Sequence, residues 1–360
     1  MEINMDLLKR ITEVNGIAGH EGQVRELFKE ETKDYVDDFL QDGLGGIFGH
    51  SVGNEEGPRL MLAAHMDEVG FMVQQITKEG FLHFIPIGGW WNQVLLSQQV
   101  EVTTREGKTY RGVIGSKPPH ILKPDERKQP MDISNMFIDL GASSKEEVEA
   151  WGIRQGDMIT PYIKTERLND TPYLLGKAWD DRIGVAVAIE VLKYAHAHGH
   201  DNILYAGANV QEEVGLRGAK GATYSINPDI SLALDTGIAG DTPGITEKEA
   251  ASHLGKGVQI LFFDSSMIPH RGLRDFVIDL AEKENIPYQL DSVVGGGTDA
   301  GSQHQSLGGV PSLAIGIPVR YLHTHGSVIH EDDFKSYVRL ATAIVKHLDK
   351  KAYEQIIQNG

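Results

Sequence analysis

Residues 208–215 read Ala-Asn-Val-Gln-Glu-Glu-Val-Gly and close an apolar, strand-like run that begins at Asn202. Two adjacent glutamates, Glu212 and Glu213, would be unusual at the end of such a run if they served only the fold. Because successive side chains of a strand point to opposite faces, one glutamate can bind a metal while the other acts on water. Together with histidines and aspartates elsewhere in the chain, the pair indicates a hydrolase built around two divalent cations.

Further strand-like runs lie on both sides of this stretch and alternate with helical patterns. The apolar runs cover residues 59–64, 231–234, 258–263 and 312–317. Apolar residues at helical spacing predict helices over residues 7–14, 23–39 and 181–196. This order predicts an α/β fold with a mainly parallel sheet that helices cover on both sides.

The middle of the chain has a different character. Residues 70–76 and 81–85 predict a β-hairpin, and further strand-like pieces cover residues 99–103 and 110–114. A capping-box pattern, Ser143-Ser144-Lys145-Glu146, predicts the start of one helix. We therefore expect a catalytic domain made of residues 1–68 plus 168–360. It is interrupted by an inserted β-rich domain, residues 69–167, which we expect to serve oligomerisation and substrate access.

Composition narrows the class of protein. Of the 360 residues, 40% are hydrophobic and 24% charged, which is ordinary for a globular protein with a real core. The net charge of −17 argues against nucleic-acid binding, which needs a basic surface. Cysteine is absent, so histidine and carboxylate remain as metal ligands. The chain shows no signal-peptide pattern and no run of about 18 apolar residues, so we expect a cytoplasmic protein that does not enter the membrane.

Four polar residues, His65, Glu212, Glu213 and Asp235, each follow an apolar strand-like run. Catalytic groups of parallel sheets lie at the carboxyl ends of the strands, so we expect these side chains to converge. In the triplet His65-Met66-Asp67 both polar side chains lie on one face of an extended strand. His65 can bind a cation while the carboxylate of Asp67 orients its ring, although an ordinary structural role explains the triplet equally well.

Other candidates carry a structural explanation beside the functional one. Asp180 and Asp181 precede a helical pattern, where an aspartate caps free N–H groups, but a carboxylate can also bridge two cations. We favour Asp180 as the bridge and Asp181 as the structural residue. Near the end of the chain, Tyr321-Leu322-His323-Thr324-His325-Gly326 offers two histidines, with His330 close by. The glycine-rich run 295–301, which includes Thr298 and Asp299, predicts a tight loop that approaches a substrate.

Taken in order, these motifs resemble the glutamyl aminopeptidase and tetrahedral aminopeptidase family of co-catalytic metallopeptidases. The motifs are His65-x-Asp67, Trp179-Asp180-Asp181-Arg182, Gln211-Glu212-Glu213-Val214-Gly215, Asp235, Gly295-Gly296-Gly297-Thr298-Asp299 and Tyr321-Leu322-His323. The resemblance covers nearly the whole chain, including residues 116–122 and 137–142. It implies a three-layer, phosphorylase/hydrolase-like catalytic domain with a small PDZ-like β domain inserted.

The same resemblance implies a role for each residue. His65 and Asp235 hold one metal, Glu213 and His323 hold the other, and Asp180 bridges the two. Glu212 is the general base and Asp67 orients His65, while Thr298 and Asp299 are candidates for substrate binding. Zinc suits these ligands best, and cobalt or manganese can replace it. The family also implies dimers that assemble into hollow dodecamers admitting only short peptides. After His323 the chain reads Thr324-His325-Gly326, which departs from the Ser-Pro of many members.

The expected activity is therefore a metal-dependent aminopeptidase that removes N-terminal amino acids from short peptides. The preferred side chain stays open: Arg271, Arg274 or Arg320 could supply a cation for an acidic residue, but each also fits an ordinary surface or ion-pair role. Three alternatives remain. They are a di-metal deacylase or dipeptidase acting on blocked peptides, an endoglucanase-like glycoside hydrolase, and a non-enzymatic scaffold.

Overall fold

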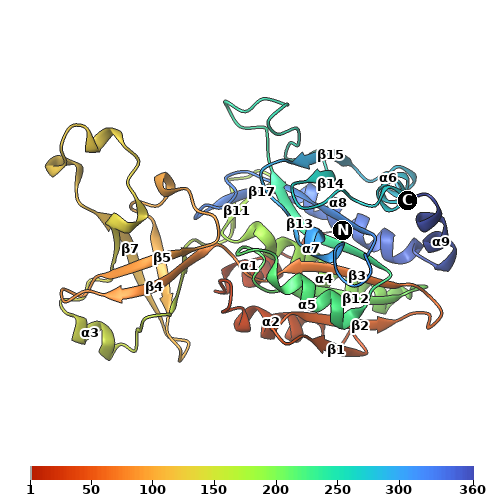
Figure 1. Cartoon of the computed structure of the whole chain (residues 1–360), viewed down its shortest axis with the longest axis horizontal. Coiled ribbons are helices and arrows are strands. Elements are labelled where there is room, and N and C mark those ends of the chain that lie inside the picture. Colours follow the sequence, from red (N-terminus) through yellow and green to blue (C-terminus); the bar gives the residue numbers. More distant parts are fainter. Residues whose placement is uncertain (1) are drawn as a thin grey trace.

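The computed structural model describes residues 2–360. Figure 1 shows a small β-barrel, formed by the middle of the chain, beside a larger α/β body that contains both ends of the sequence. No helix among residues 2–360 combines the length and the apolar character needed to cross a membrane.

The body is built on a mixed sheet of eight strands. In spatial order these are β1 (Asp38–Gln41), β2 (Ile47–Val52), β12 (Ile203–Asn209), β3 (Arg59–His65), β13 (Ile230–Ile238), β16 (Ser312–Val319), β14 (Val258–Asp264) and β15 (Tyr288–Val293). The four strands from β12 to β16 run parallel, as predicted. The pairs β1–β2, β2–β12 and β14–β16 are antiparallel, so the parallel character is confined to the centre and to the β14–β15 pair.

Helices cover both faces of this sheet, and the alternation of side chains along β3 shows how. Leu60 and Leu62 enter the main core with α1 (Met5–Glu13), α2 (Gly22–Thr32), α4 (Trp179–His198) and α8 (Glu331–His347). Met61 and Ala63 point the other way and meet α5 (Arg217–Ile226). Helix α7 (Asp299–Gln303) packs beside α5, while α6 (Arg271–Lys283) lies between α8 and α9 (Lys350–Gln358) and contacts both. The body therefore has three layers.

One helix is shorter than its sequence pattern predicts. We expected residues 23–39 to be helical, but α2 ends at Thr32 and Asp38–Gln41 form strand β1, paired with β2. Val36 and Phe39 still pack against the main core. Their apolar spacing therefore reflects burial in a turn and an edge strand, which the helical pattern alone does not distinguish.

The inserted region closes into a six-stranded barrel. Its strands, in spatial order, are β4 (Gly70–Ile76), β5 (Leu82–Ile87), β8 (Met136–Asp139), β7 (Thr109–Ser116), β6 (Gln99–Thr103) and β9 (Met158–Pro161). The predicted hairpin is present as β4–β5. Helix α3 (Lys145–Ala150) begins one residue later than the capping box suggests, because Ser144 accepts the N–H of Glu147 and Glu147 in turn accepts that of Ser143.

Smaller elements complete the chain. A three-stranded sheet of β10 (Glu166–Arg167), β11 (Tyr173–Gly176) and β17 (Ser327–His330) lies on the path between barrel and body. Single turns of 3-10 helix cover Asn92–Val94, Pro119–Ile121, Glu126–Lys128 and Ile133–Asn135.

A buried arginine holds the N-terminal segment, the end of β3 and the start of α4 together. The side chain of Arg182 is fully buried and donates to main-chain oxygens of Ile11, Val14, Gly16 and Met66 at 2.6–3.1 Å. Its positive charge is paired with one buried carboxylate.

That carboxylate belongs to Glu68, whose Oε1 lies 3.3 Å from Arg182 and 2.6 Å from the ammonium of Lys177. All three side chains are buried. Since a buried charge without partners is very costly, this triad depends on each of its members being present.

Arg182→Met should therefore destabilise the protein by about 3–5 kcal/mol, the usual cost of removing one partner of a buried charge pair. Urea unfolding measured by circular dichroism checks this. Arg105→Met is the control, because Arg105 is exposed in the β6–β7 turn. Equal unfolding midpoints for the two variants would contradict the assigned role of Arg182.

Candidate metal centre

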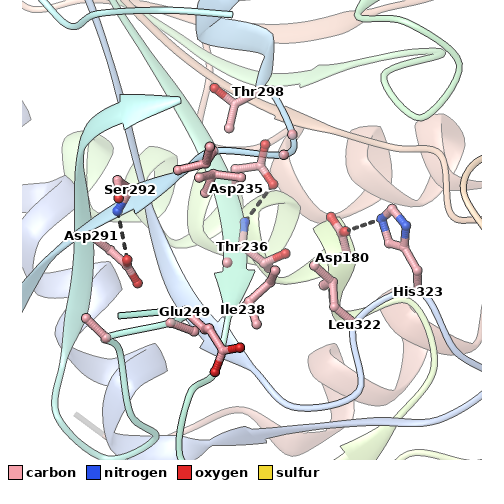
Figure 2. A pocket seen from close by; sticks show the side chains of 18 of the residues that line it. Asp180, Asp235, Thr236, Ile238, Glu249, Asp291, Ser292, Thr298, Leu322 and His323 are labelled. Carbon is pink, nitrogen blue, oxygen red and sulfur yellow. Dashed lines mark hydrogen bonds and ion pairs between the residues drawn. The ribbon is translucent and has the colours of Figure 1, made fainter. Parts of the chain in front are cut away.

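The predicted ligands converge at one edge of the sheet, at the carboxyl ends of the central strands. His65 is the last residue of β3, Asp235 lies within β13, and Glu212 and Glu213 follow β12. Asp180 stands in the first turn of α4. His323 lies in the loop after β16, and Figure 2 shows its ring directed at Asp180, with Asp235 nearby. Strand β13 continues to Ile238, so Asp235 does not end its strand as the sequence suggested.

The carboxylate of Asp180 lies between two imidazoles. Its Oδ1 is 3.2 Å from Nε2 of His65, and its Oδ2 is 3.2 Å from Nε2 of His323, the ion pair drawn in Figure 2. The Oε2 of Glu213 lies 3.4 Å from the same nitrogen of His323. Each oxygen of Asp180 thus faces a different histidine, which is the arrangement that a carboxylate bridging two cations requires.

Two overlapping groups of side chains bring their ligand atoms within 4.8 Å of one another. One group is His65, Asp180 and Glu213, and the other is His65, Glu212 and Asp235. Glu212 is therefore close enough to His65 and Asp235 to share a cation with them. Its Oε2 is 3.8 Å from Nε2 of His65.

The electrostatics of this cluster fit bound cations. Burial, reinforced by the charge of Asp180, raises the pKa of both Glu213 and Asp235 to about 8. Burial also raises the pKa of Glu212 well above its usual value. The pKa of Asp180 is instead lowered, because bonds from the two imidazoles outweigh burial. The Oε1 atom of Glu213 is buried with no hydrogen-bond partner. Divalent cations would supply the missing partner and the missing positive charge.

Asp67 supports the cluster in a different way from the predicted one. Nδ1 of His65 lies 2.9 Å from the main-chain oxygen of Asp67, whereas the carboxylate Oδ1 is 3.6 Å away. Donation from Nδ1 leaves Nε2 available to a cation. The carboxylate of Asp67 accepts the N–H groups of Glu212 and Glu213, at 3.0 and 3.1 Å.

Asp181 and Asp299 serve as buried acceptors. Asp181 accepts the N–H groups of His65 and Gly184 at 3.1 and 3.0 Å, in agreement with the structural role we favoured. Asp299, a candidate for substrate binding, lies beneath the cavity surface instead and accepts from Asn209 at 2.7 Å. Helix α7 begins at Asp299, whose side chain is buried, and its role in substrate binding stays a prediction.

A cavity of about 680 Å³ opens beside the cluster. Its lining includes Asp180, Glu212, Glu213, Asp235 and His323, together with the predicted Gly295–Gly297 loop and Thr298. The hydroxyl of Thr298 donates to Asp264 at 2.9 Å. Figure 2 shows Ile238 and Leu322 on the cavity wall below the cluster and Glu249 beyond them. Of the tail histidines only His323 reaches the cluster, since His325 is buried against Trp90.

The cavity wall offers little positive charge. None of Arg271, Arg274 and Arg320 lines it, and Arg320 is paired with Asp241. Lys248 is the single lysine or arginine among the described lining residues. The apolar wall residues Ile238, Phe262, Leu290, Val294 and Leu322 were not predicted. They come from separate strands and loops, and nothing in their spacing signals that they share a wall.

An α/β fold with a buried His/Asp/Glu cluster at its strand ends defines the class of metal-dependent hydrolases. Comparison with known proteins gives the family. A model of the M42 glutamyl aminopeptidase family matches residues 45–340, and a second model, AMPT, matches residues 2–28.

Relatives match over almost their full length. The chain is 38% identical to the glutamyl aminopeptidase of Lactococcus lactis subsp. cremoris, covering 98% of each protein. It is 43% identical to the crystallised TET aminopeptidase of a marine sediment Thaumarchaeota archaeon, with a TM-score of 0.95 and 98% of each chain covered. The TET1 peptidase of Pyrococcus horikoshii, which can assemble into a tetrahedron or a large octahedral shell, is 34% identical with a TM-score of 0.84, over 96% of this chain and 99% of that one. The chain belongs to the M42 glutamyl aminopeptidase family, and it is an aminopeptidase.

His65→Ala and His323→Ala should each weaken metal binding by more than about tenfold, since each removes a nitrogen donor at the cluster. Metal content after dialysis against defined Zn²⁺ concentrations, measured by inductively coupled plasma mass spectrometry, checks this. His196→Ala, an exposed position on α4, is the control. Unchanged content in either variant would remove that histidine from the ligands.

Proposed function

We propose that this protein removes N-terminal amino acids from short peptides with the help of two divalent cations held at the cluster. The observation that carries the proposal is the position of Asp180, whose two oxygens each face a different imidazole at 3.2 Å. His65 and Asp235 would hold one cation, Glu213 and His323 the other, with Asp180 between them. Zinc suits these nitrogen and oxygen donors, and cobalt or manganese is compatible with them.

When bound, the cations polarise the scissile carbonyl and lower the pKa of water. The residues of the chain supply proton transfer. Glu212 lines the cavity, and its main-chain N–H donates to the carboxylate of Asp67. Glu212 is the general base in this proposal: it takes a proton from the attacking water and returns it to the leaving amine. Burial raises the pKa of Glu212, which makes it a stronger base than an exposed carboxylate.

The free α-amino group of the substrate fits this site because the cluster is rich in carboxylates. A cavity of about 680 Å³ is in the range that encloses small ligands. Its apolar wall matches an apolar first side chain. Glu249 stands on the same wall, and its carboxylate is fixed by hydrogen bonds from Thr246. Its negative charge would repel an acidic first side chain of the substrate.

The remaining predictions from the sequence extend this proposal. We assign residues 1–68 plus 168–360 to the catalytic domain and residues 69–167 to an inserted, PDZ-like domain, supported by a six-stranded barrel with one short α-helix. A dodecamer built from dimers is supported by the shells of the Pyrococcus horikoshii relative. Sedimentation velocity, which separates monomers, dimers and dodecamers, tests the assembly. A cytoplasmic location agrees with the absence of cysteine.

Two alternative activities differ from the proposed one in their substrates or in their dependence on metal. A deacylase or dipeptidase of the same metal chemistry would act on blocked peptides and leave free-amine substrates intact. An endoglucanase-like glycosidase would work with two carboxylates and resist chelators.

A panel of aminoacyl-p-nitroanilides tests the proposed activity. We expect leucyl and other apolar substrates to exceed glutamyl and aspartyl substrates in kcat/KM by more than about tenfold, because the wall offers apolar contact and little positive charge. Chelator should abolish turnover, and Zn²⁺, Co²⁺ or Mn²⁺ should restore it. N-acetyl-leucyl-p-nitroanilide is the matched blocked control. A preference for glutamyl substrates would contradict our assignment of the wall, and a preference for blocked substrates would favour the deacylase.

Glu212→Gln should keep both cations and lower kcat by roughly 10²–10⁴-fold, the usual contribution of a general base. Steady-state kinetics and metal analysis on the same preparation check this. Near-normal turnover in this variant would refute Glu212 as the base.

A further inference from the structure

A second buried carboxylate, Glu21, reaches the turn that carries the two glutamates. Glu21 immediately precedes α2, and only 4% of its surface is exposed. Its Oε1 accepts the N–H of Gly19 at 2.8 Å and the N–H of Gln211 at 3.1 Å. The second bond joins segments 190 residues apart in the sequence. Neither the motifs nor the proposed mechanism assigns Glu21 a role.

Gln211 lies in the turn between β12 and α5, two positions after β12 ends. Its φ is +57°, in the left-handed region that residues other than glycine rarely adopt. The turn is closed on its far side by the N–H groups of Gly215 and Leu216, which both donate to the carbonyl of Glu212 at 2.9 Å. The carbonyl of Gln211 accepts the N–H of Arg217 within the turn, and its N–H is held from outside the turn by Glu21, which supports the strained conformation.

Two carboxylates therefore hold three successive N–H groups. Glu21 accepts from Gln211, and Asp67 accepts from Glu212 and Glu213. These bonds fix the main chain of the turn against two different segments, the start of α2 and the end of β3. The directions in which Glu212 and Glu213 leave the turn are thereby determined before substrate arrives, which is what proton transfer by a positioned base requires.

Keeping a carboxylate buried at position 21 costs the folded state free energy. Burial, together with the charge of Asp67, raises the pKa of Glu21 to about 7, so keeping this acid buried beside Asp67 works against stability. Groups that oppose stability yet are held by the surrounding fold gather at functional sites.

We propose that Glu21 is a positioning residue of the peptidase site, which holds the N–H of Gln211 so that Glu212 points correctly at the reacting water. The inference rests on the proposed function of Glu212 as the general base. Glu21 touches neither substrate nor cations in this role and acts through the main chain of the turn.

The test compares three substitutions of Glu21 at saturating metal. Glu21→Ala removes the acceptor, Glu21→Asp keeps the charge but withdraws the acceptor by one methylene, and Glu21→Gln keeps an acceptor oxygen without the charge. Glu30→Ala, exposed on the same helix, is the control. We measure kcat and KM on the best aminoacyl-p-nitroanilide, bound metal, and the midpoint of thermal unfolding.

We expect Glu21→Ala and Glu21→Asp to lower kcat by about 10- to 100-fold, with KM within twofold and bound metal unchanged. Glu21→Gln should recover kcat to within about threefold of the parent, because the acceptor is retained. A lower unfolding midpoint with kcat per folded enzyme unchanged would overturn the proposal and leave Glu21 as a structural residue. An equal loss of kcat in Glu21→Gln and Glu21→Ala would overturn the role of the hydrogen bond.

The variants also keep the two proposals apart. If Glu21→Ala does not fold, the comparison of Glu21→Asp with Glu21→Gln decides, since these two differ in acceptor reach and charge. Turnover by Glu212→Gln would defeat the general-base assignment, and with it this inference. Loss of turnover in Glu212→Gln with full kcat in every variant of Glu21 would defeat this inference alone.

Discussion

Concentrated negative charge at the end of the sheet is the constraint on which the rest of the structure depends. Asp180, Glu212, Glu213 and Asp235 bring four carboxylates to one cluster, and the two imidazoles of the cluster lie against them. Without cations, burial and mutual repulsion favour the protonated forms of Glu212, Glu213 and Asp235, whose pKa values are raised, while Asp180 stays ionised between the two imidazoles. The parallel strands bring the acids together, and the surrounding hydrogen bonds keep them there.

The supporting hydrogen bonds act on the main chain rather than on the acids themselves. Asp67 accepts from the N–H groups of Glu212 and Glu213, and Asp181 accepts from that of His65. A side chain held in this way keeps its own oxygens or nitrogen free for a ligand. A second, separate network of ion pairs joins Arg182, Glu68 and Lys177. It connects the segment after β3 to the start of α4.

Much of this arrangement could be predicted from sequence because a simple rule governs it: polar residues that follow apolar strands meet at one edge of a parallel sheet. That rule, with the family resemblance, led to His65, Glu212, Glu213 and Asp235. It does not reach the features that tertiary contacts decide. Nothing in the glycine-rich motif indicates that the side chain of Asp299 is buried and accepts a hydrogen bond from Asn209. Glu21 gave no signal at all, because its partner lies 190 residues further along the chain. Residues 36–39 kept an apolar spacing that fits helix and strand alike.

The place where the barrel enters the chain has a mechanical consequence. Strand β4 starts at Gly70, three residues after Asp67, and the returning chain passes through β11, which ends at Gly176, before it reaches Asp180. The entry into the barrel is therefore a short link to Asp67, whereas the barrel's last strand, β9, ends at Pro161, 19 positions before Asp180. A displacement of β4 relative to the body would therefore act first on Asp67, whose carboxylate holds the N–H groups of Glu212 and Glu213.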